Sequence, residues 1–153
     1  MDVHTFLGSR GVPFTCIEHA PRFDAQRLAQ TIDIPGDRVG KSVLLRTDEG
    51  YCLAVLPATH MIDLDRVREV LHTESVVLAD ESEVFEQFSD CEPGAIPPFG
   101  SEYDMTTLVD EALATADDVV FESNTHDEAI RMRFSDYMRI EQPTVARISH
   151  HSH

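Results

Sequence analysis

The chain has 153 residues, 42% of them hydrophobic and 26% charged, with a net charge of −16 at neutral pH. This length fits one domain with its own hydrophobic core, and no apolar run approaches the roughly 18–20 residues of a membrane-spanning helix. The negative charge repels phosphate backbones, which argues against a protein that coats DNA or RNA and restricts any contact with nucleic acid to a small basic site.

The cysteines and the first residues favour a reducing, cytoplasmic location. Cys16, Cys52 and Cys91 are widely spaced and form no Cys-x-x-Cys pair, so a disulfide framework or a cysteine zinc site is not expected. Residues 1–11 lack a basic segment followed by a hydrophobic one. We therefore expect no secretory signal peptide and no membrane partner.

Helical and strand-like patterns alternate along the chain. The clearest are a hairpin, in which two apolar segments flank the turn TDEG, and two helix starts with acidic N-caps at Asp63 and Asp80. In chain order we expect a helix at 1–10, a strand at 13–19, a helix at 25–32 capped by Asp24, strands at 39–46 and 51–57, a helix at 62–71, a short buried strand at 75–79, a helix at 81–88, part strand and part turn at 104–113, strands at 118–123 and 128–134, a helix at 135–140 and a last strand or tail at 143–149.

This order predicts an α+β fold, within the broad α/β class, in which helices pack around a mixed, largely antiparallel sheet. The chain has no internal repeat or linker, so we expect a single domain over residues 1–149. Residues 150–153 read HHSH and are expected to form a disordered or artificial tail. Because no glycine-rich phosphate loop follows a strand, we expect no nucleotide cofactor.

The segment DCEPGAIPPFG, residues 90–100, holds two glycines and three prolines and cannot be the middle of a helix or a central strand. Gly94 allows the backbone to approach a ligand closely, while Pro97 and Pro98 make the loop stiff. The amides of residues 94–96 can point at an anion or at an oxyanion that develops during a reaction. Taken alone, such a stretch is more commonly an ordinary surface turn.

Other residues offer weaker signals. Lys41 is the single lysine among 12 basic residues, which fits a position that needs a compact ammonium group, although chance explains it as well. Cys91 and His126 could form a nucleophilic dyad, but a lone cysteine is more often a packing residue. No serine lies in a Gly-x-Ser-x-Gly elbow, and the histidines show no metal-ligand spacing, so we expect no metal site.

Four segments together resemble the YbaK / prolyl-tRNA-synthetase-associated editing domain family, the stand-alone aminoacyl-tRNA deacylases. They are VGKSVLLR, LAVLPATHMIDLDRV, DCEPGAIPPFG and VVFESNTHDEAIRM, which occur in the family's order between Pro13 and Ile140. GAIPP matches the family's Gly-x-x-x-Pro loop, Lys41 stands at its strand lysine, and His126 lies in its histidine-containing turn. Asn124 replaces a usual glycine there, and asparagine tolerates the left-handed conformation.

The resemblance implies a barrel-like sheet and hydrolysis, in trans, of the ester in mischarged tRNA. In this scheme Lys41 anchors the acceptor end of the tRNA, the amides of the loop, including those of Gly94 and Ala95, stabilise the oxyanion, and a ribose hydroxyl orients the attacking water. His126 lines the aminoacyl pocket and is a weaker candidate for a general base. The residues expected to contact the substrate are Ile96, Pro97, Pro98 and Phe99, as a stiff wall, with Asn124 and Thr125. An aminoacyl-tRNA synthetase is a further expected partner, and DNA is not.

Two other functions stay open at this point. The chain could be a non-catalytic binding or regulatory module whose acidic surface meets a protein. It could also hydrolyse small acyl esters without tRNA.

Overall fold

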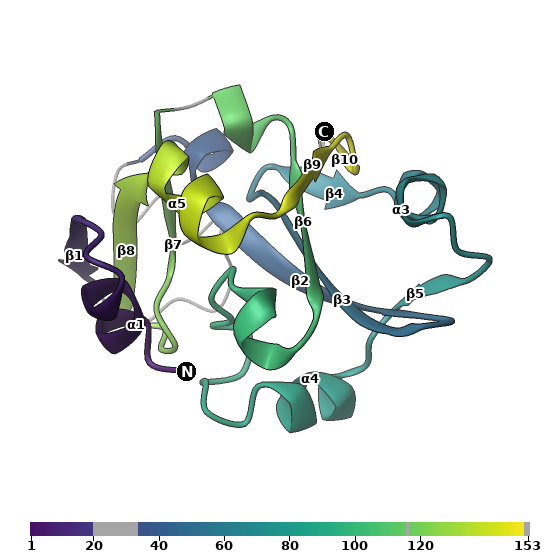
Figure 1. Ribbon diagram of the computed structural model, residues 1–153, viewed down its shortest axis with the longest axis horizontal. Helices are drawn as coiled ribbons and strands as arrows, with labels where there is room; N and C mark the ends of the chain where they lie inside the picture. The colour runs from purple at the N-terminus through teal and green to yellow at the C-terminus, as the bar shows by residue number, and fades with distance from the viewer. Residues whose placement is uncertain (20–33, 116, 152–153) are drawn as a thin grey trace.

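The computed structural model describes residues 1–19, 34–115 and 117–151, and Figure 1 shows how their helices and strands are arranged. The helix expected at 25–32, with its cap at Asp24, lies outside these residues. The helices are α1 (Val3–Ser9), α3 (Leu64–Leu71), α4 (Glu81–Gln87) and α5 (Phe134–Glu141). The strands are β1 (Phe14–Glu18), β2 (Gly40–Thr47), β3 (Gly50–Pro57), β4 (His60–Ile62), β5 (Val76–Leu78), β6 (Thr106–Asp110), β7 (Asp118–Glu122), β8 (Glu128–Arg133), β9 (Thr144–Ala146) and β10 (Ser149–His151).

The strands form a five-stranded sheet in the order β5-β2-β3-β6-β9, a three-stranded sheet β1-β8-β7 and a two-stranded pair β10-β4. All neighbours are antiparallel except β3–β6 and β6–β9, which are parallel. A bridge between Val39 and Val120 connects the two larger sheets. The α+β fold with a mixed, largely antiparallel sheet is therefore confirmed, but across the described residues the sheets do not close into one barrel.

Two helices begin at the capping residues that the sequence predicts. Asp63 accepts a hydrogen bond from the amide of Arg66 at the start of α3. Asp80 and Glu83 form a reciprocal capping box at the start of α4, as expected from their spacing. Within the described residues, no helix is long and apolar enough to cross a membrane.

Two expectations are wrong, one about a buried strand and one about a disordered tail. Residues 75–79 do not form a buried strand, because β5 pairs only with β2 at the sheet's edge and leaves Val77 and Leu78 exposed. His150 and His151 are not part of a disordered tail, since they lie in β10 and pair with β4. The buried carboxylate of Asp110 fixes this end of the chain by accepting hydrogen bonds from the amide of Ile148 and the hydroxyl of Ser149.

The largest part of the core joins α1 and α5 to the three-stranded sheet, and it includes Phe99 from the loop of residues 90–100. Phe99 is fully buried, with its ring centroid 5.1 Å from that of Phe6 and 5.5 Å from those of Phe121 and Tyr137. In Figure 1, α1 with the three-stranded sheet lies at one end of the molecule, α3 and β5 lie at the other, and α4 lies below the long hairpin. The loop thus runs from α4 back into the aromatic core.

Tyr137 provides a test of how this loop is held. Its buried hydroxyl donates a 2.8 Å hydrogen bond to the carbonyl oxygen of Pro98. We expect Tyr137→Phe to lower the free energy of unfolding by about 1–3 kcal/mol, because a buried carbonyl loses its donor while the ring packing is kept. Urea unfolding measures this. Tyr51→Phe is the matched control, since the Tyr51 hydroxyl donates to Glu83 in a part-buried position and should cost less than about 1 kcal/mol. Equal losses for the two variants would contradict the prediction.

Candidate functional site

The C-terminal end of the loop is fixed by buried polar groups on β6 and α5. The amide of Gly100 donates to the Thr107 hydroxyl at 3.0 Å, and that hydroxyl donates to Glu141 at 2.5 Å. Glu141 also accepts hydrogen bonds from the amide and the hydroxyl of Ser101. A Cβ at Gly100 would lie 2.5 Å from the Thr107 hydroxyl and 3.2 Å from Cβ of Leu53, so this position accepts only glycine. Burial raises the pKa of Glu141, and its hydrogen bonds to Ser101 and Thr107 partly oppose that shift.

The N-terminal end of the loop is fixed by His126, which lies in the turn between β7 and β8. One ring nitrogen donates to the carbonyl oxygen of Pro93, and the other lies 3.1 Å from a carboxylate oxygen of Glu122. The imidazole is 2% exposed. Burial lowers the pKa of His126, but the hydrogen bond to Pro93 and the charge and hydrogen bond of Glu122 outweigh it, so the pKa is raised. Because Pro93 and Glu122 occupy both ring nitrogens, neither nitrogen is directed at a water molecule, which favours a positioning role over a general base.

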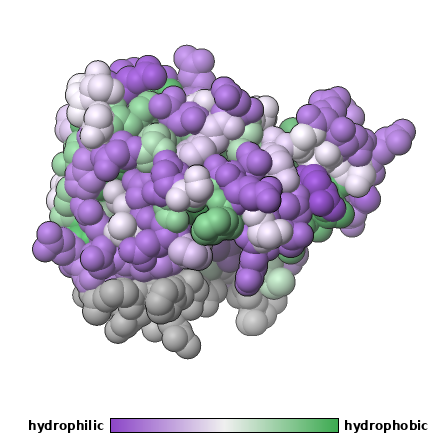
Figure 2. Space-filling model, turned by 90° about the horizontal axis from the view of Figure 1, so that it is seen from below, coloured by the Kyte–Doolittle hydropathy of each residue, from purple (hydrophilic) through white to green (hydrophobic). Residues whose placement is uncertain are grey.

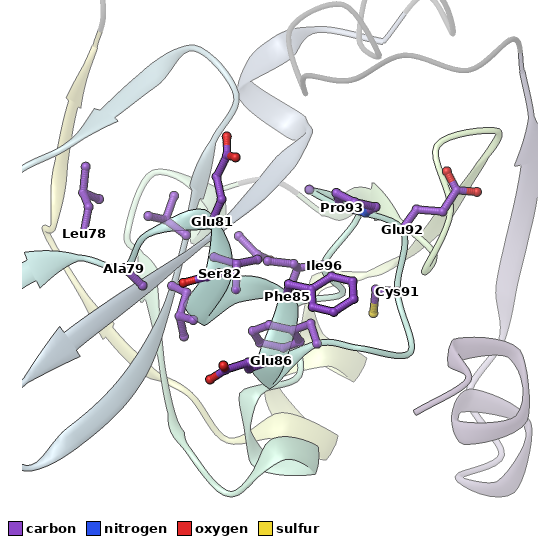
Figure 3. Close-up of a pocket in the computed structure, with 16 residues that line it drawn as sticks. Leu78, Ala79, Glu81, Ser82, Phe85, Glu86, Cys91, Glu92, Pro93 and Ile96 are labelled. Atoms are coloured by element: carbon purple, nitrogen blue, oxygen red, sulfur yellow. The ribbon is translucent and has the colours of Figure 1, made fainter.

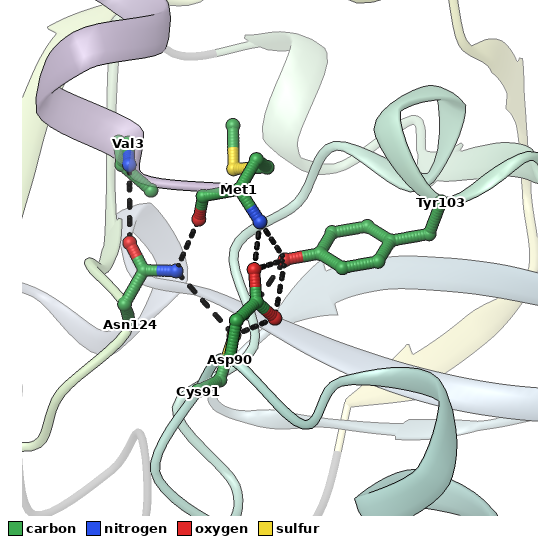
Figure 4. Close-up of polar contacts among 6 residues, drawn as sticks. All are labelled: Met1, Val3, Asp90, Cys91, Tyr103 and Asn124. Carbon is green, nitrogen blue, oxygen red and sulfur yellow. Dashed lines mark hydrogen bonds and ion pairs between the residues drawn. The ribbon is translucent and has the colours of Figure 1, made fainter.

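Asn124 connects the same turn to the N-terminal segment (Figure 4). Its side-chain oxygen accepts the amide of Val3 at 3.1 Å, and its side-chain nitrogen donates to the carbonyl oxygen of Met1 at 2.7 Å and to Sγ of Cys91 at 3.4 Å. Its backbone is left-handed, with φ at 67°, as expected for asparagine in this turn. Beside it, Asp90 accepts hydrogen bonds from Tyr103 and from the amino group of Met1. Asn124 therefore acts as a structural link between α1 and the loop.

The Cys91–His126 dyad is not formed. The contacts of Cys91 Sγ are with Asp90, Tyr103 and Asn124. Both ring nitrogens of His126 are engaged by Pro93 and Glu122. Cys91 is therefore a packing and hydrogen-bonding residue in this arrangement.

Between these anchors, Gly94 and Ile96 present their backbone amides. Gly94 has φ at +83°, a conformation that other residues adopt only with strain. The amide of Ala95 donates to the carbonyl oxygen of Glu92 at 3.0 Å, so the expectation that it is available for an oxyanion is wrong. Across the described parts of the chain, the amides of Gly94 and Ile96 have no hydrogen-bond acceptor. These two amides are the donors that the loop can offer to a ligand.

A cavity of about 840 Å³ opens beside these amides (Figure 3). Its walls come from the loop, from α4, from the end of β5 and from residues 42–44 of β2. Its lining is mainly apolar and includes Ile96 and Phe85. Phe85 is 65% exposed. Three carboxylates also belong to the lining, those of Glu81, Glu86 and Glu92. Figure 2 views the molecule from the side of α4 and shows a largely hydrophilic face with an apolar patch near its centre.

The other residues expected at the site are placed differently. Pro97, Pro98 and Phe99 are buried, and Ile96 is the member of that group in the described lining of the cavity. Their physical role is to anchor the loop in the core, so the expected wall is reduced to Ile96. The hydroxyl of Thr125 donates to Asp127 at 2.6 Å within its own turn.

Lys41 lies in β2 next to Ser42. Leu44 packs in the same core cluster as Ile96, whereas Val43 packs in a different cluster. Because successive side chains of a strand point to opposite faces, Lys41 belongs to the face of Val43, away from Ile96. Nζ of Lys41 donates to the carbonyl oxygen of Ala58 at 3.4 Å, beyond the end of β3. The structure thus brings Gly94 and His126 together, whereas Lys41 is not among the described residues that line the cavity.

Comparison with known proteins identifies the family. A family model described as an aminoacyl-tRNA editing domain matches residues 19–140. The chain belongs to the aminoacyl-tRNA editing domain family. This confirms the resemblance drawn from the four sequence segments.

Two curated relatives of this editing domain carry names related to tRNA. The domain is 28% identical over 110 residues to proline–tRNA ligase of Bacillus subtilis (strain 168), which covers 71% of this chain and 19% of the ligase. It is 30% identical over 94 residues to the multifunctional Ser/Thr-tRNA deacylase ProXp-y of Escherichia coli (strain K12), which covers 61% of this chain and 56% of the deacylase. The alignments therefore span less than two thirds of either relative.

Solved structures share the fold of the editing domain. The hypothetical protein APE2540 matches with a TM-score of 0.89 at 17% identity, covering 97% of this chain and 99% of that one. A second structure belongs to a protein described as a trans-editing enzyme for prolyl tRNA synthetase. It matches with a TM-score of 0.85 at 20% identity, and the match covers 97% of this chain and 94% of that one. These likenesses confirm the α+β architecture.

His126 yields a pH-dependent prediction. Its pKa is raised from the ordinary value of 6.5, so its contribution to stability is fully present below pH 6.5 and is lost as the pH rises through the raised pKa. We expect the free-energy difference between wild type and His126→Asn, measured by urea unfolding between about pH 5 and pH 9, to shrink as the pH increases.

His72→Asn is the matched control for this series, because His72 is exposed at the left-handed C-cap of α3 and asparagine tolerates that conformation. This variant measures the effect of removing an exposed imidazole from the same chain. A titration of the His126 ring by NMR that gives a pKa at or below 6.5 would contradict the assignment.

Proposed function

We propose that this editing domain hydrolyses the ester bond between an amino acid and the terminal adenosine of mischarged tRNA, in trans and in the cytoplasm. The observation that carries the proposal is the pair of backbone amides without an intramolecular acceptor at Gly94 and Ile96, two residues that line a mainly apolar cavity and belong to a loop fixed at both ends. Membership of the family and the named activity of the relative ProXp-y support the same reaction class. The reaction needs no covalent nucleophile, because the ester is already activated.

Backbone amides are suited to this step because negative charge develops on the carbonyl oxygen when water attacks. A well-placed donor to such an oxyanion is worth about 3–4 kcal/mol. The ring of His126 lies directly behind Gly94, since a Cβ there would be 3.6 Å from Cε1 of His126. When this ring is protonated, its charge stabilises the oxyanion further, while a ribose hydroxyl of the substrate orients the water. Atoms of the substrate and of the main chain thus perform the chemistry.

The charges around the cavity support an orientation for the substrate. The carboxylates of Glu81, Glu86 and Glu92 attract the positively charged α-amino group of an aminoacyl ester and repel phosphates. The tRNA backbone must then leave the cavity on another side. Lys41, which lies in β2 outside the described lining of the cavity, is the ammonium group proposed to hold the acceptor end, and an aminoacyl-tRNA synthetase remains a candidate partner.

Gly94→Ala tests the position of the amides. Space exists for the new Cβ, so the effect comes from the positive φ, which costs about 1–2 kcal/mol and shifts the neighbouring peptide planes. We expect kcat for deacylation to fall by about tenfold to a hundredfold, the effect of a misplacement near 1 Å. Single-turnover hydrolysis across a full panel of mischarged tRNAs provides the measurement.

Gly11→Ala is the matched control, because Gly11 also has a positive φ, at +66°, and open space around a Cβ. It should lower stability and leave the rate unchanged. If Gly94→Ala keeps the wild-type rate on every active substrate, the backbone oxyanion site is refuted. If the wild-type domain hydrolyses no member of the panel, or if uncharged tRNA does not compete, the proposed function gives way to a binding module or to a small-ester hydrolase.

Lys41→Ala tests the anchor for tRNA. A charge-assisted hydrogen bond is worth about 1.5–3 kcal/mol, so we expect kcat/KM to fall at least about tenfold at low salt. The slope of log(kcat/KM) against log[salt] should also decrease by about one unit, since one phosphate contact is lost. Arg68→Ala is the control, because Arg68 is exposed and ion-paired with Asp65 on its own helix. An unchanged salt slope in Lys41→Ala would remove Lys41 from the phosphate contact.

A further inference from the structure

We propose that His4, Cys16 and Glu128 form a binding site for a zinc-type divalent cation, separate from the editing cavity. Their ligand atoms all lie within 4.8 Å of one another. The three side chains come from α1, β1 and β8. The proposal does not depend on the editing function.

The geometry follows from how α1 packs on the three-stranded sheet. Cys16 pairs with Ile130 across the β1–β8 ladder, and Glu128 lies two residues from Ile130, so both side chains belong to the same face. This is the face that α1 covers, since Ile130 shares a core cluster with Val3, Phe6 and Leu7.

His4 projects from that helix to the edge of the interface. Its ring lies edge-on to Phe14 of β1, with the ring centroids 5.6 Å apart. That contact holds the imidazole beside the sheet at the position where Cys16 and Glu128 meet.

The distances fit a metal with tetrahedral coordination. Sγ of Cys16 lies 3.8 Å from Nε2 of His4. Two ligands at the usual zinc–sulfur and zinc–nitrogen distances, with a tetrahedral angle between them, are about 3.5 Å apart. Nε2 of His4 already contacts a carboxylate oxygen of Glu128. Small rotations of side chains that are partly exposed can therefore place all three atoms around one ion.

The chemistry of the donors selects the class of ion. A thiolate, an imidazole and a carboxylate are the ligands that zinc accepts, whereas magnesium and calcium prefer oxygen alone. The side chains of His4 and Glu128 are 41% and 25% exposed and Cys16 is exposed, so water can fill the fourth position. Binding releases the thiol proton to the solvent, because the thiolate is the ligand.

Titration of the full chain with cobalt(II) tests the site, because a cobalt–thiolate bond absorbs in the near ultraviolet and bonds to histidines alone do not. We expect one equivalent of cobalt to produce this absorption and zinc to displace it. Cys16→Ala should abolish the absorption. His4→Ala and Glu128→Gln should weaken cobalt binding by more than about tenfold, the loss that even second-shell changes can produce.

Two controls exclude the thiol of Cys91 and the C-terminal histidines. Cys91→Ala should keep the absorption, because Cys91 lies on the loop and contacts other partners. The double variant His150→Ala/His151→Ala should also keep it, although any weak binding by these two histidines of β10 is lost. Zinc should raise the midpoint of thermal unfolding in wild type and not in Cys16→Ala, since the ion connects α1 to the sheet.

The proposal fails if wild-type protein gives no thiolate absorption, or if Cys16→Ala retains it. Circular dichroism of Cys16→Ala shows whether the fold is kept, and an exposed cysteine on an edge strand should be replaceable without unfolding. If that variant is unfolded, Glu128→Gln decides: full cobalt affinity in this variant overturns the site, and weakened affinity supports it.

Discussion

The hydrogen bond from the buried imidazole of His126 to the carbonyl oxygen of Pro93 is the contact on which the site depends. It fixes the point at which the loop leaves α4, and it places the imidazole directly behind Gly94. Glu122, on the preceding strand, contacts the other ring nitrogen and helps to raise the pKa of His126. The turn between β7 and β8 thus determines both the shape and the electrostatic potential of the loop.

The loop is rigid because its two ends are held by different parts of the fold. Asn124 and His126 hold the first end, whereas Tyr137 and Glu141 on α5 hold the second. Both sets of contacts include buried polar groups, which lose a hydrogen bond without replacement if the loop moves. This explains how a loop without regular secondary structure can keep two amides fixed at the edge of a cavity, which oxyanion stabilisation requires.

Much of this architecture could be predicted from local sequence, and the exceptions have a common cause. The hairpin of β2 and β3 and the caps at Asp63 and Asp80 depend on neighbouring residues, so pattern and spacing were sufficient. The resemblance also located the loop and the turn that carries His126. The use of the Ala95 amide and the edge position of β5 depend on contacts that no local pattern reveals.

The same reasoning applies to Glu141, Tyr137 and the grouping of His4, Cys16 and Glu128. Each residue looks ordinary in the sequence, because its partner lies on a distant segment. For Glu141 and Tyr137 the signal is the burial of an acidic or hydroxyl side chain, and for the other three residues it is their proximity, and both require the tertiary fold. Phe99 shows the opposite error: an apolar residue in a candidate binding loop proved to be part of the core.

The contacts that shape the loop join residues far apart in the chain, 33 positions between His126 and Pro93, 39 between Tyr137 and Pro98 and 121 between Val3 and Asn124. Long-range contacts of this kind form late, after the entropy of closing the intervening chain has been overcome. During synthesis on the ribosome, the segment around Gly94 therefore has no defined shape until α5 has emerged. For the proposed hydrolysis this means that a truncated or half-folded polypeptide would lack the loop geometry that the reaction requires.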